Sequence, residues 1–332
     1  MHARIAGVGH YTPGVVLTND EIVARFGLKV DSKWIEDRTG IVERHWLAEG
    51  ETTSDMVVAA ARRILEATGT RASEVDLLVL ATVSPDHPSP ATATIVARKL
   101  GLSCAAFDLS AACAGFLYGL EIAEGAILSG KKRRVLVVAA DARSRYLDPS
   151  NHRGVVLFAD GAAGALVVPS ESPGLLAVRT GAEGRERMGA WIPAGGAARP
   201  TSTDTVAEGL HYLQVDGRNE IFELFVDYTR RICDEALAAA KLGWGDVDLF
   251  ITHQGNARLV EAIVAAMGVP PEKAMNTIAR HGNVSGATVP LALSEAAASG
   301  RIKPGDRVLL TSVGAGYVFG AAIHAFEEPP RT

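Results

Sequence analysis

One cysteine stands where it could act as a nucleophile. Cys113 lies in Ser110-Ala-Ala-Cys-Ala-Gly-Phe116, whose small residues leave room for another molecule to approach the sulfur. Apolar residues recur at helical spacing from Phe116 onward, so we expect Cys113 at the start of a helix. The dipole and the unpaired N–H groups of a helix start favour a thiolate and can stabilise an adjacent oxyanion. The pattern therefore predicts nucleophilic chemistry at sulfur; the alternative is a cysteine that only fills the core.

A histidine and a glycine turn could assist this sulfur. His253 follows an apolar run that predicts a buried strand, and the loops at the C-terminal ends of parallel strands hold the chemistry of α/β sheets. It is a candidate base or hydrogen-bond donor, the alternative being a structural histidine. The glycine turn at residues 314–316 follows the last buried strand and could present a backbone N–H to an oxyanion.

The second half of the chain repeats the first. The segment Glu74-Val-Asp-Leu-Leu-Val-Leu80 matches Asp246-Val-Asp-Leu-Phe-Ile-Thr252, an offset of 172 residues. Aligning the glycines that end the following helices gives an offset of 170 and places Asn283 at the position that Cys113 holds in the first half. Two such helix starts should face each other across a pseudo-two-fold axis. We therefore expect Cys113 and Asn283 to share one site.

The elements that would hold these residues alternate between buried strands and helices. Continuous apolar runs such as residues 75–81 predict parallel strands that are covered on both faces. Thr18, with Glu21 three residues later, predicts a helix that starts with a capping box. We expect an α/β protein of two similar halves, residues 1–170 and 171–332.

Composition narrows the class of protein. A chain of 332 residues with 48% hydrophobic residues and 34 glycines suits a compact α/β fold, and a net charge of −5 argues against nucleic acid as the main partner. Three scattered cysteines form no disulfide framework, and no Cys/His spacing suggests zinc. The start of the chain lacks a signal-peptide core, and no segment reaches the roughly 20 apolar residues that span a bilayer. We expect a cytoplasmic protein that enters no membrane.

Four motifs resemble, in order and spacing, the active-site motifs of β-ketoacyl-[acyl-carrier-protein] synthase III, a family of the thiolase superfamily. They are residues 110–116, 253–256, 282–288 and 314–316. The resemblance extends from Gly7 to Phe326. It implies a thiolase-like, five-layered α-β-α-β-α fold built from two duplicated halves, a homodimer, and no metal or redox cofactor.

The resemblance also implies a mechanism. Cys113, His253 and Asn283 would be the catalytic residues, with Cys113 taking an acyl group from coenzyme A as a thioester. Malonyl-acyl carrier protein would then lose CO2 while His253 and Asn283 donate hydrogen bonds to its thioester oxygen. The resulting carbanion would attack the Cys113 thioester, and the backbone N–H groups of Cys113 and Ala315 would form the oxyanion hole.

Substrate-binding residues follow from the same resemblance. Trp34 and Arg153 would sandwich the adenine of coenzyme A, and Arg38 and Asn256 would contact coenzyme A or its pantetheine arm. Arg258 would meet the acidic carrier protein. The helix after Arg258 lacks the extra lysines that many relatives carry there, which leaves the carrier-protein footprint open.

Four residues are assigned to the acyl pocket: Ser89, Arg143, Phe158 and Val313, with Ser89 acting on the pocket of the neighbouring subunit. Ser89, Arg143 and Val313 stand where larger apolar residues are expected, which predicts a wider and more polar pocket. The alternative is that neighbouring residues compensate and that Arg143 turns to solvent. A guanidinium in the pocket could hold a carboxylate through two parallel hydrogen bonds.

Three enzyme functions stay open. The leading one is the initiating condensation of an acyl-coenzyme A primer with malonyl-acyl carrier protein. Residues 84–87 and 192–200 look similar to a subgroup that uses a dicarboxylic primer, such as glutaryl-coenzyme A, in biotin-precursor synthesis. An acyltransferase of natural-product assembly would move the acyl group without condensation. A degradative thiolase would carry a second cysteine in residues 311–317, where this chain has none.

Overall fold

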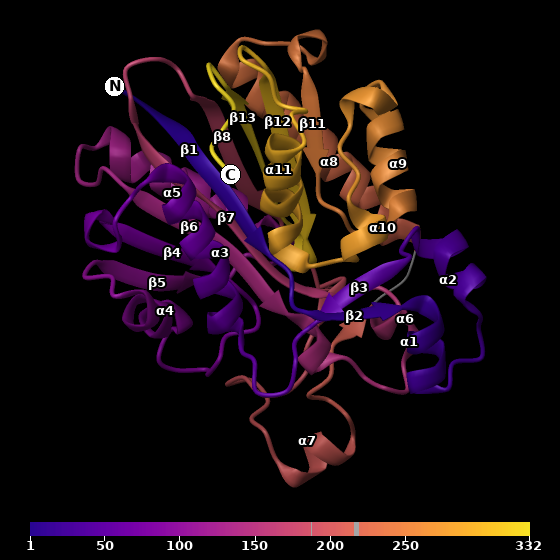
Figure 1. Ribbon diagram of the computed structural model, residues 1–332. Coiled ribbons are helices and arrows are strands. Elements are labelled where there is room, and N and C mark those ends of the chain that lie inside the picture. The colour runs from indigo at the N-terminus through magenta and orange to yellow at the C-terminus, as the bar shows by residue number, and fades with distance from the viewer. Residues whose placement is uncertain (187, 216–218) are drawn as a thin grey trace.

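Two β-sheets form the frame of the molecule (Figure 1). The computed structural model describes residues 1–186, 188–215 and 219–332. One sheet runs β1-β7-β6-β4-β5, and the other runs β8-β13-β12-β11. The strands of the first sheet are β1 (His2–Tyr11), β4 (Leu77–Ala81), β5 (Ala105–Leu109), β6 (Val135–Ala142) and β7 (Asp160–Ser170). Those of the second are β8 (Leu175–Ala182), β11 (Leu249–Thr252), β12 (Arg307–Gly314) and β13 (Val318–Ala325).

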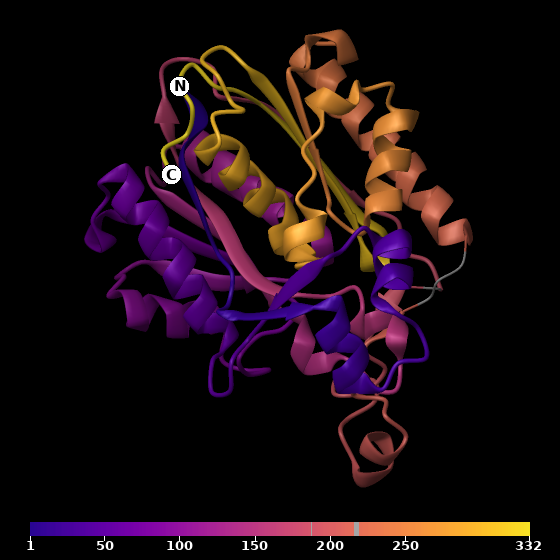
Figure 2. The same cartoon turned by 45° about the vertical axis from the view of Figure 1, so that its right-hand side comes forward.

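Helices form three layers around these sheets. Outside the first sheet lie α3 (Thr53–Thr68) and α4 (Thr92–Leu100), between the sheets lie α5 (Gly115–Leu128) and α11 (Thr288–Ala298), and outside the second lie α8 (Asn219–Ala240) and α9 (Ala257–Ala266). Figure 2 shows α5 and α11 side by side between the two sheets. One apolar core surrounds the central helices and contacts both sheets, and two further cores lie under the outer helices of each sheet. The expected five-layered α-β-α-β-α arrangement is confirmed.

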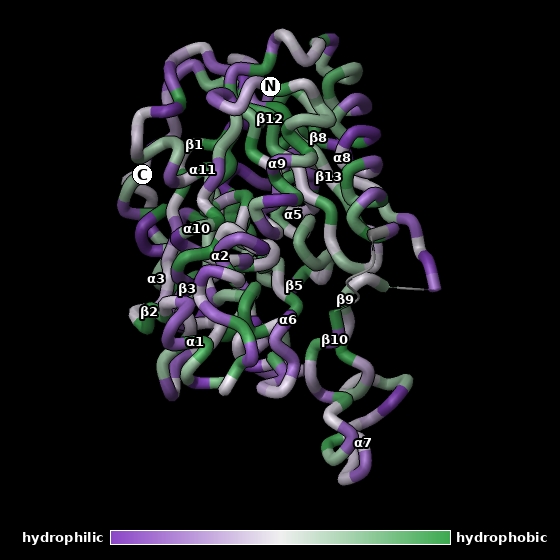
Figure 3. Tube along the Cα trace, turned by 90° about the vertical axis from the view of Figure 1, so that its right-hand side faces the viewer, coloured by the Kyte–Doolittle hydropathy of each residue, from purple (hydrophilic) through white to green (hydrophobic). Residues whose placement is uncertain are grey.

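Shorter elements connect and flank the strands of the two sheets. Two strand pairs are β2 (Val15–Thr18) with β3 (Glu43–Trp46), and β9 (Ala190–Trp191) with β10 (Gln214–Val215). Short helices are α1 (Asn19–Phe26), α2 (Ser32–Thr39), α6 (His152–Val155), α7 (Thr203–Ala207) and α10 (Ile278–His281). The 3-10 turns are η1 (Ala72–Glu74), η2 (Ala112–Ala114), η3 (Arg143–Tyr146), η4 (Trp244–Asp246), η5 (Pro271–Lys273), η6 (Ser285–Ala287) and η7 (Ala315–Tyr317). The segment that carries α7 projects from the body of the molecule (Figures 1 and 3).

Local sequence signals explain several of these elements. Every residue of β4 is buried, because helices cover both faces of its sheet. In Figure 3 the strands of the second sheet are mostly green, whereas the outer helix α8 mixes purple and green, as a half-exposed helix should. The predicted capping box at α1 is confirmed: Thr18 Oγ1 accepts the Glu21 N–H, and the Glu21 carboxylate accepts the Thr18 N–H at 2.7 Å. None of the helices in the described ranges is long and apolar enough to cross a membrane.

The two sheets place their strands in matching positions. β4 beside β6 corresponds to β11 beside β12, both parallel pairs, and β7 and β13 follow antiparallel in each sheet. The first sheet ends at Ser170 and the second begins at Leu175. The two halves nevertheless share the central core, and the chain end returns to the first sheet, where Arg331 pairs with Gly7. The division into residues 1–170 and 171–332 therefore remains a prediction. It describes a repeat within the chain, because the two halves share one core.

The pairing of Cys113 with Asn283 that the repeat predicts is wrong by three residues. The turn η2 precedes α5 as η6 precedes α11, and the first residues of the two turns, Ala112 and Ser285, share a left-handed backbone with φ of 42° and 54°. Gly286 therefore corresponds to Cys113. The cause is helix length: α5 has 14 residues and α11 has 11, so an alignment on the helix ends shifts the helix starts.

Candidate active site

Cys113 occupies a 3-10 turn immediately before α5, at the predicted helix start. The hydroxyl of Ser312 donates to the carbonyl oxygen of Cys113 at 2.8 Å. A Cβ atom on Gly314 would lie 2.7 Å from the Cys113 nitrogen, so the glycine turn packs directly against the cysteine backbone. These contacts hold the sulfur between α5 and the end of β12.

The state of the Cys113 sulfur differs from the expectation. Burial raises the pKa of the thiol to about 11, although the Arg143 charge and the Ser285 hydroxyl both lower it. The Cys113 Sγ lies 3.8 Å from the Ser285 Oγ. The helix start is expected to favour the thiolate, but burial opposes this effect and raises the pKa of the thiol above its usual range. Burial raises the pKa of Cys233 further, to about 12.

His253 directly follows β11, and its ring is buried. Its backbone N–H donates to the carbonyl oxygen of Thr311 at 2.9 Å, which holds the residue to β12. Its Nδ1 lies 2.7 Å from the hydroxyl oxygen of Thr288, the first residue of α11. Burial lowers the pKa of His253 to about 4, so the ring is neutral at physiological pH.

Asn283 lies between α10 and η6 and is tied to the β6–β7 connection. Its N–H donates to the carbonyl oxygen of Leu157 at 3.0 Å, and its own carbonyl accepts from the Ala159 N–H at 2.9 Å. Its side-chain oxygen accepts the Ser285 N–H at 2.8 Å. Because Oδ1 has this partner, the amide group of Asn283 presents its two N–H donors elsewhere.

These residues meet in one cavity of about 490 Å³. Its walls include Cys113, His253, Asn283 and Ala315, the four positions assigned to catalysis from the sequence. Ser285 also lines it. Ser285 and Thr288 were not predicted as site residues, although both fall in the motif of residues 282–288. Their position in the same motif as Asn283 is the sequence feature that could have identified them as site residues.

A buried carboxylate that the sequence reasoning missed ties three segments of the site together. Asp141, at the end of β6, accepts from the Val83 N–H at 2.8 Å and from the Ser84 hydroxyl at 3.0 Å. Its other oxygen accepts the Gly286 N–H at 3.3 Å. The carboxylate thereby joins the loop after β4 to the turn that follows Asn283. Only the fold shows this role, since the donors come from distant parts of the chain.

The four residues assigned to the acyl pocket lie in different parts of the structure. Arg143 and Phe158 line the cavity, with the guanidinium carbon 5.2 Å from the Phe158 ring centre. Arg143 is only 7% exposed, so the alternative that it turns to solvent is wrong. Val313 is not in the cavity wall: it is 2% exposed in the core beneath α8 and α9, because alternation along β12 turns it away from the face of Ser312. Ser89 is exposed in the loop before α4, and its action on a neighbouring subunit stays a prediction.

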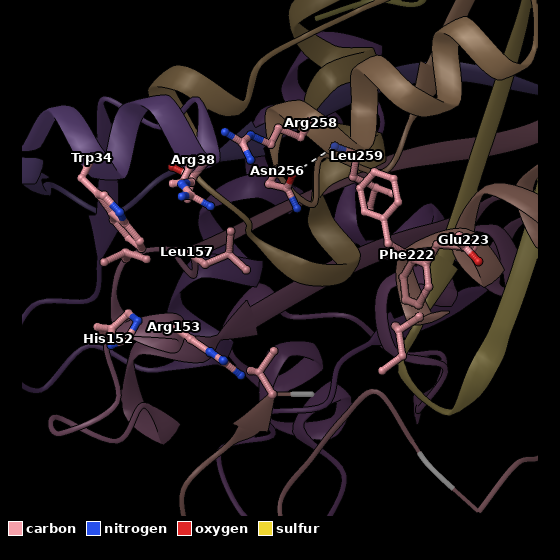
Figure 4. A pocket seen from close by; sticks show the side chains of 15 residues that line it. Trp34, Arg38, His152, Arg153, Leu157, Phe222, Glu223, Asn256, Arg258 and Leu259 are labelled. Atoms are coloured by element: carbon pink, nitrogen blue, oxygen red, sulfur yellow. Dashed lines mark hydrogen bonds between the residues drawn. The ribbon is translucent and has the colours of Figure 1, made fainter. Parts of the chain in front are cut away.

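A second cavity, of about 700 Å³, adjoins the first at the surface. Leu157, Asn256 and Leu259 line both. The outer wall contains all five residues assigned to coenzyme A and the carrier protein: Trp34, Arg38, Arg153, Asn256 and Arg258. Figure 4 shows Trp34 and Arg38 on one side of this cavity and His152 and Arg153 on the opposite side. The two cavities together form a route from the surface to Cys113.

The outer cavity carries an excess of positive charge. Among the described residues its wall contains three arginines, Arg38, Arg153 and Arg258, and one acidic residue, Glu223. The Arg38 guanidinium lies 5.6 Å from the Trp34 ring centre, and Arg258 donates to the carbonyl of Asp37 at 3.0 Å. Guanidinium groups beside an indole suit a ligand that combines phosphates with a flat ring. In the part of the chain that the structure describes, no three His, Cys, Asp or Glu side chains are arranged to hold a metal ion.

Comparisons with known proteins identify the same family along almost the whole chain. Residues 107–184 match the family described as 3-oxoacyl-[acyl-carrier-protein] synthase III, and residues 237–326 match its C-terminal part. A β-ketoacyl-[acyl-carrier-protein] synthase III of Rhodopirellula baltica is 40% identical, with 96% of this chain and 97% of the relative covered. The crystal structure of the Aquifex aeolicus 3-oxoacyl-[acyl-carrier-protein] synthase III is 35% identical and superposes with a TM-score of 0.87 over 98% of this chain and all of the other. That of Pseudomonas aeruginosa is 32% identical, with a TM-score of 0.90 and 99% of each chain covered. The chain belongs to the 3-oxoacyl-[acyl-carrier-protein] synthase III family.

Proposed function

We propose that the protein condenses an acyl-coenzyme A primer with malonyl-acyl carrier protein and so starts a fatty-acid-type synthesis. The observation that carries this proposal is the placement of Cys113, His253 and Asn283 in one cavity, which an arginine-rich outer cavity joins to the surface. A nucleophilic sulfur, two hydrogen-bond donors and a phosphate-binding entrance are the parts that this reaction needs.

The first half-reaction transfers the primer to Cys113. The sulfur forms a bond to the thioester carbon, the bond from that carbon to coenzyme A breaks, and the thiol proton passes to the departing coenzyme A sulfur. Burial raises the pKa of the Cys113 thiol, so we propose that the thiol loses its proton as the new bond forms. Backbone N–H groups of Cys113 and Ala315 stabilise the oxyanion of this step.

The second half-reaction forms the new carbon–carbon bond. The bond to the malonyl carboxylate breaks, CO2 leaves, and the electron pair becomes an enolate at the thioester. His253 and Asn283 donate hydrogen bonds to the enolate oxygen, where charge develops. The enolate carbon then attacks the Cys113 thioester, the carbon–sulfur bond breaks, and the sulfur takes up a proton from water. Substrates and protein groups supply every electron pair in these steps, so no cofactor is required.

The outer cavity would bind the coenzyme A part of the primer. Trp34 and Arg153 lie on opposite walls, where they could hold the adenine between them. Arg38 and Asn256 would contact the phosphates and the pantetheine arm. Arg258, at the first turn of α9, would meet an acidic group of the carrier protein.

We further propose a homodimer that pairs the first sheets of two copies. β5 is an edge strand with unpaired backbone groups, and its Phe107 is 36% exposed. Pairing two such edges across a two-fold axis would cover both. Ser89 of each copy would then approach the acyl pocket of the other. Sedimentation should give a dimer for the wild type and a monomer for Phe107→Asp.

Intact-protein mass spectrometry tests the central proposal. Wild-type protein incubated with acetyl-, butyryl- or hexanoyl-coenzyme A should gain one acyl group, whereas Cys113→Ser should gain none under the same conditions. Acylated protein mixed with malonyl-acyl carrier protein should release CO2 and form the β-ketoacyl product. Acylation without CO2 release would indicate an acyltransferase instead of a condensing enzyme.

A second candidate function is condensation of a primer that carries a carboxylate. The observation that favours it is Arg143, which lines the Cys113 cavity, is buried, and has an Nε without a hydrogen-bond partner among the described residues. Its neighbour Asp141 already accepts hydrogen bonds from the loop after β4 and from Gly286. A buried guanidinium with an unpaired N–H disfavours a purely alkyl chain and can hold a carboxylate through two parallel hydrogen bonds. A dicarboxylic primer such as glutaryl-coenzyme A fits this arrangement.

Relative acylation rates separate the two primer classes. If Arg143 holds a carboxylate, Arg143→Leu should slow acylation by glutaryl-coenzyme A by roughly 10- to 100-fold more than acylation by butyryl-coenzyme A, because loss of the charge beside Cys113 affects both primers alike. Arg145→Leu is the matched control, since Arg145 lies in the same turn but is exposed. A strong preference of the wild type for acetyl-coenzyme A, or a glutaryl rate that ignores Arg143, would remove this candidate.

A further inference from the structure

The two ring nitrogens of His253 have different surroundings. Nδ1 lies 2.7 Å from the hydroxyl oxygen of Thr288. Nε2 has no hydrogen-bond partner among the described residues, and the side chain lines the Cys113 cavity. A Cβ atom on Gly255 would lie 3.4 Å from Nε2, so the lack of a side chain at Gly255 leaves space at this nitrogen. Nε2 is thus the nitrogen that can meet a substrate.

A neutral imidazole carries a single N–H, so only one of these nitrogens can donate. Burial lowers the pKa of His253 to about 4 and keeps the ring neutral at physiological pH. If the proton is on Nδ1, Nε2 has a lone pair and can only accept a hydrogen bond from the substrate. If the proton is on Nε2, this nitrogen donates a hydrogen bond to the substrate. The group that bonds Nδ1 therefore decides which chemistry His253 can perform.

The group that bonds Nδ1 is the Thr288 hydroxyl. It has one proton to donate, and two hydrogen-bond acceptors lie within its reach. Besides His253 Nδ1 at 2.7 Å, the carbonyl oxygen of Ser285 lies 3.0 Å from the hydroxyl oxygen. The Ser285 carbonyl also accepts the backbone N–H of Thr288. It therefore keeps a partner when the hydroxyl turns to the ring, whereas Nδ1 has no other partner among the described residues.

We infer that Thr288 is a positioning residue that donates its hydroxyl proton to Nδ1 of His253 and thereby holds the ring N–H on Nε2, facing the substrate. The inference rests on the proposed function, because an enolate oxygen needs a donor at Nε2 and not a lone pair. Thr288 is buried at the first residue of α11, so the helix fixes its backbone and the surrounding core fixes its side chain. The opposite arrangement, in which Nδ1–H donates to Thr288 and Thr288 to Ser285, would make His253 a base.

Three variants isolate the hydroxyl of Thr288. Thr288→Val keeps the side-chain shape and removes the hydroxyl, and Thr288→Ser keeps the hydroxyl. Thr252→Val is the matched control, because the Thr252 hydroxyl is also buried beside His253 but has no partner among the described residues. Thermal unfolding of each variant reports whether it folds.

Two readouts test the assignment in the full-length protein. Decarboxylation of malonyl-acyl carrier protein should fall on the order of 100-fold in Thr288→Val, the size expected for loss of one oxyanion donor, while acylation of Cys113 stays within a few-fold of wild type. Thr288→Ser should restore most of the decarboxylation rate, and Thr252→Val should match the wild type. Nitrogen-15 NMR of labelled histidine should place the His253 proton on Nε2 in the wild type.

Other outcomes overturn the inference. A wild-type His253 with its proton on Nδ1, or a Thr288→Val variant that decarboxylates as fast as the wild type, would show that Thr288 does not set a donor at Nε2. Equal losses of acylation and decarboxylation in Thr288→Val would show a general structural role. A wild type that never decarboxylates malonyl-acyl carrier protein would remove the proposed function itself, and the NMR measurement would still report the position of the proton.

Discussion

At the scale of single residues, Cys113 illustrates how two local effects compete. The helix start and the Arg143 charge favour the thiolate, but burial outweighs them and raises the pKa to about 11. We expect the alkylation rate of Cys113 by iodoacetamide to rise about tenfold per pH unit between roughly pH 7 and pH 9, with no plateau in that range. Arg143→Leu should slow alkylation at each pH, because it removes a charge that stabilises the thiolate. Peptide mass spectrometry gives the rates, and a plateau near neutral pH would contradict the raised pKa.

His253 and Asn283 should act in the same half-reaction. Their donors serve the developing enolate, so His253→Ala and Asn283→Ala should each lose about 100-fold or more in decarboxylation while Cys113 still becomes acylated. Release of labelled CO2 from malonyl-acyl carrier protein measures the first rate, and intact mass measures the second. Variants that decarboxylate normally but cannot be acylated would reverse these roles.

At the scale of elements, close packing of the glycine turn against η2 sets the position of the nucleophile. A Cβ atom at Gly314 would lie 2.7 Å from the Cys113 nitrogen, closer than real Cβ contacts allow. Gly314→Ala should therefore displace the cysteine backbone and lower the acylation rate at least about tenfold, since small misplacements of reacting groups are costly. Gly125→Ala in α5 is the control, because its Cβ would meet no atom within 4 Å. Equal acylation rates in the two variants would show that the turn can move without effect.

At the scale of the whole molecule, three histidines with lowered pKa values make stability depend on pH. Burial lowers the pKa of His10 and His253 to about 4 and that of His324 to about 3. The unfolded chain binds protons near pH 6.5 and the folded chain only below about pH 4, so the free energy of unfolding falls as the pH drops from 6.5 toward 4. At about pH 5 each histidine costs about 2 kcal/mol, because one pKa unit corresponds to about 1.4 kcal/mol. Burial raises the pKa of Asp160, so this carboxyl group changes the free energy of unfolding with pH in the opposite direction.

Urea unfolding at about pH 7.5 and about pH 5 measures this loss. His324→Gln keeps an acceptor for the Ile5 N–H, which His324 Nε2 accepts at 2.9 Å, but cannot titrate. It should lose less stability between the two pH values than the wild type, by about 2 kcal/mol. Identical losses would show that His324 does not contribute to the pH dependence.

The sequence by itself determined the features that depend on neighbouring residues along the chain. Apolar runs identified the buried strands, Thr18 with Glu21 identified the start of α1, and motif spacing brought Cys113, His253 and Asn283 together as one candidate site. These inferences succeed because helix and strand periodicity, helix capping and motif order are local properties. The alternating elements indicated an α/β protein of two similar halves, and the five-layered arrangement was implied by the family resemblance alone.

Only the tertiary structure decided the features that depend on contacts between distant segments. The side chain of Arg143 lies in the cavity and that of Val313 in a separate core, a difference that depends on which face of each element the neighbouring layers cover. The pKa of Cys113 depends on burial by both halves of the chain, and no local motif encodes it. Thr288 acts on a histidine 35 residues away in the sequence, and an equally buried hydroxyl at Thr252 has no described partner. Burial, strand facing and hydrogen-bond partners arise from packing in three dimensions, so sequence spacing cannot supply them.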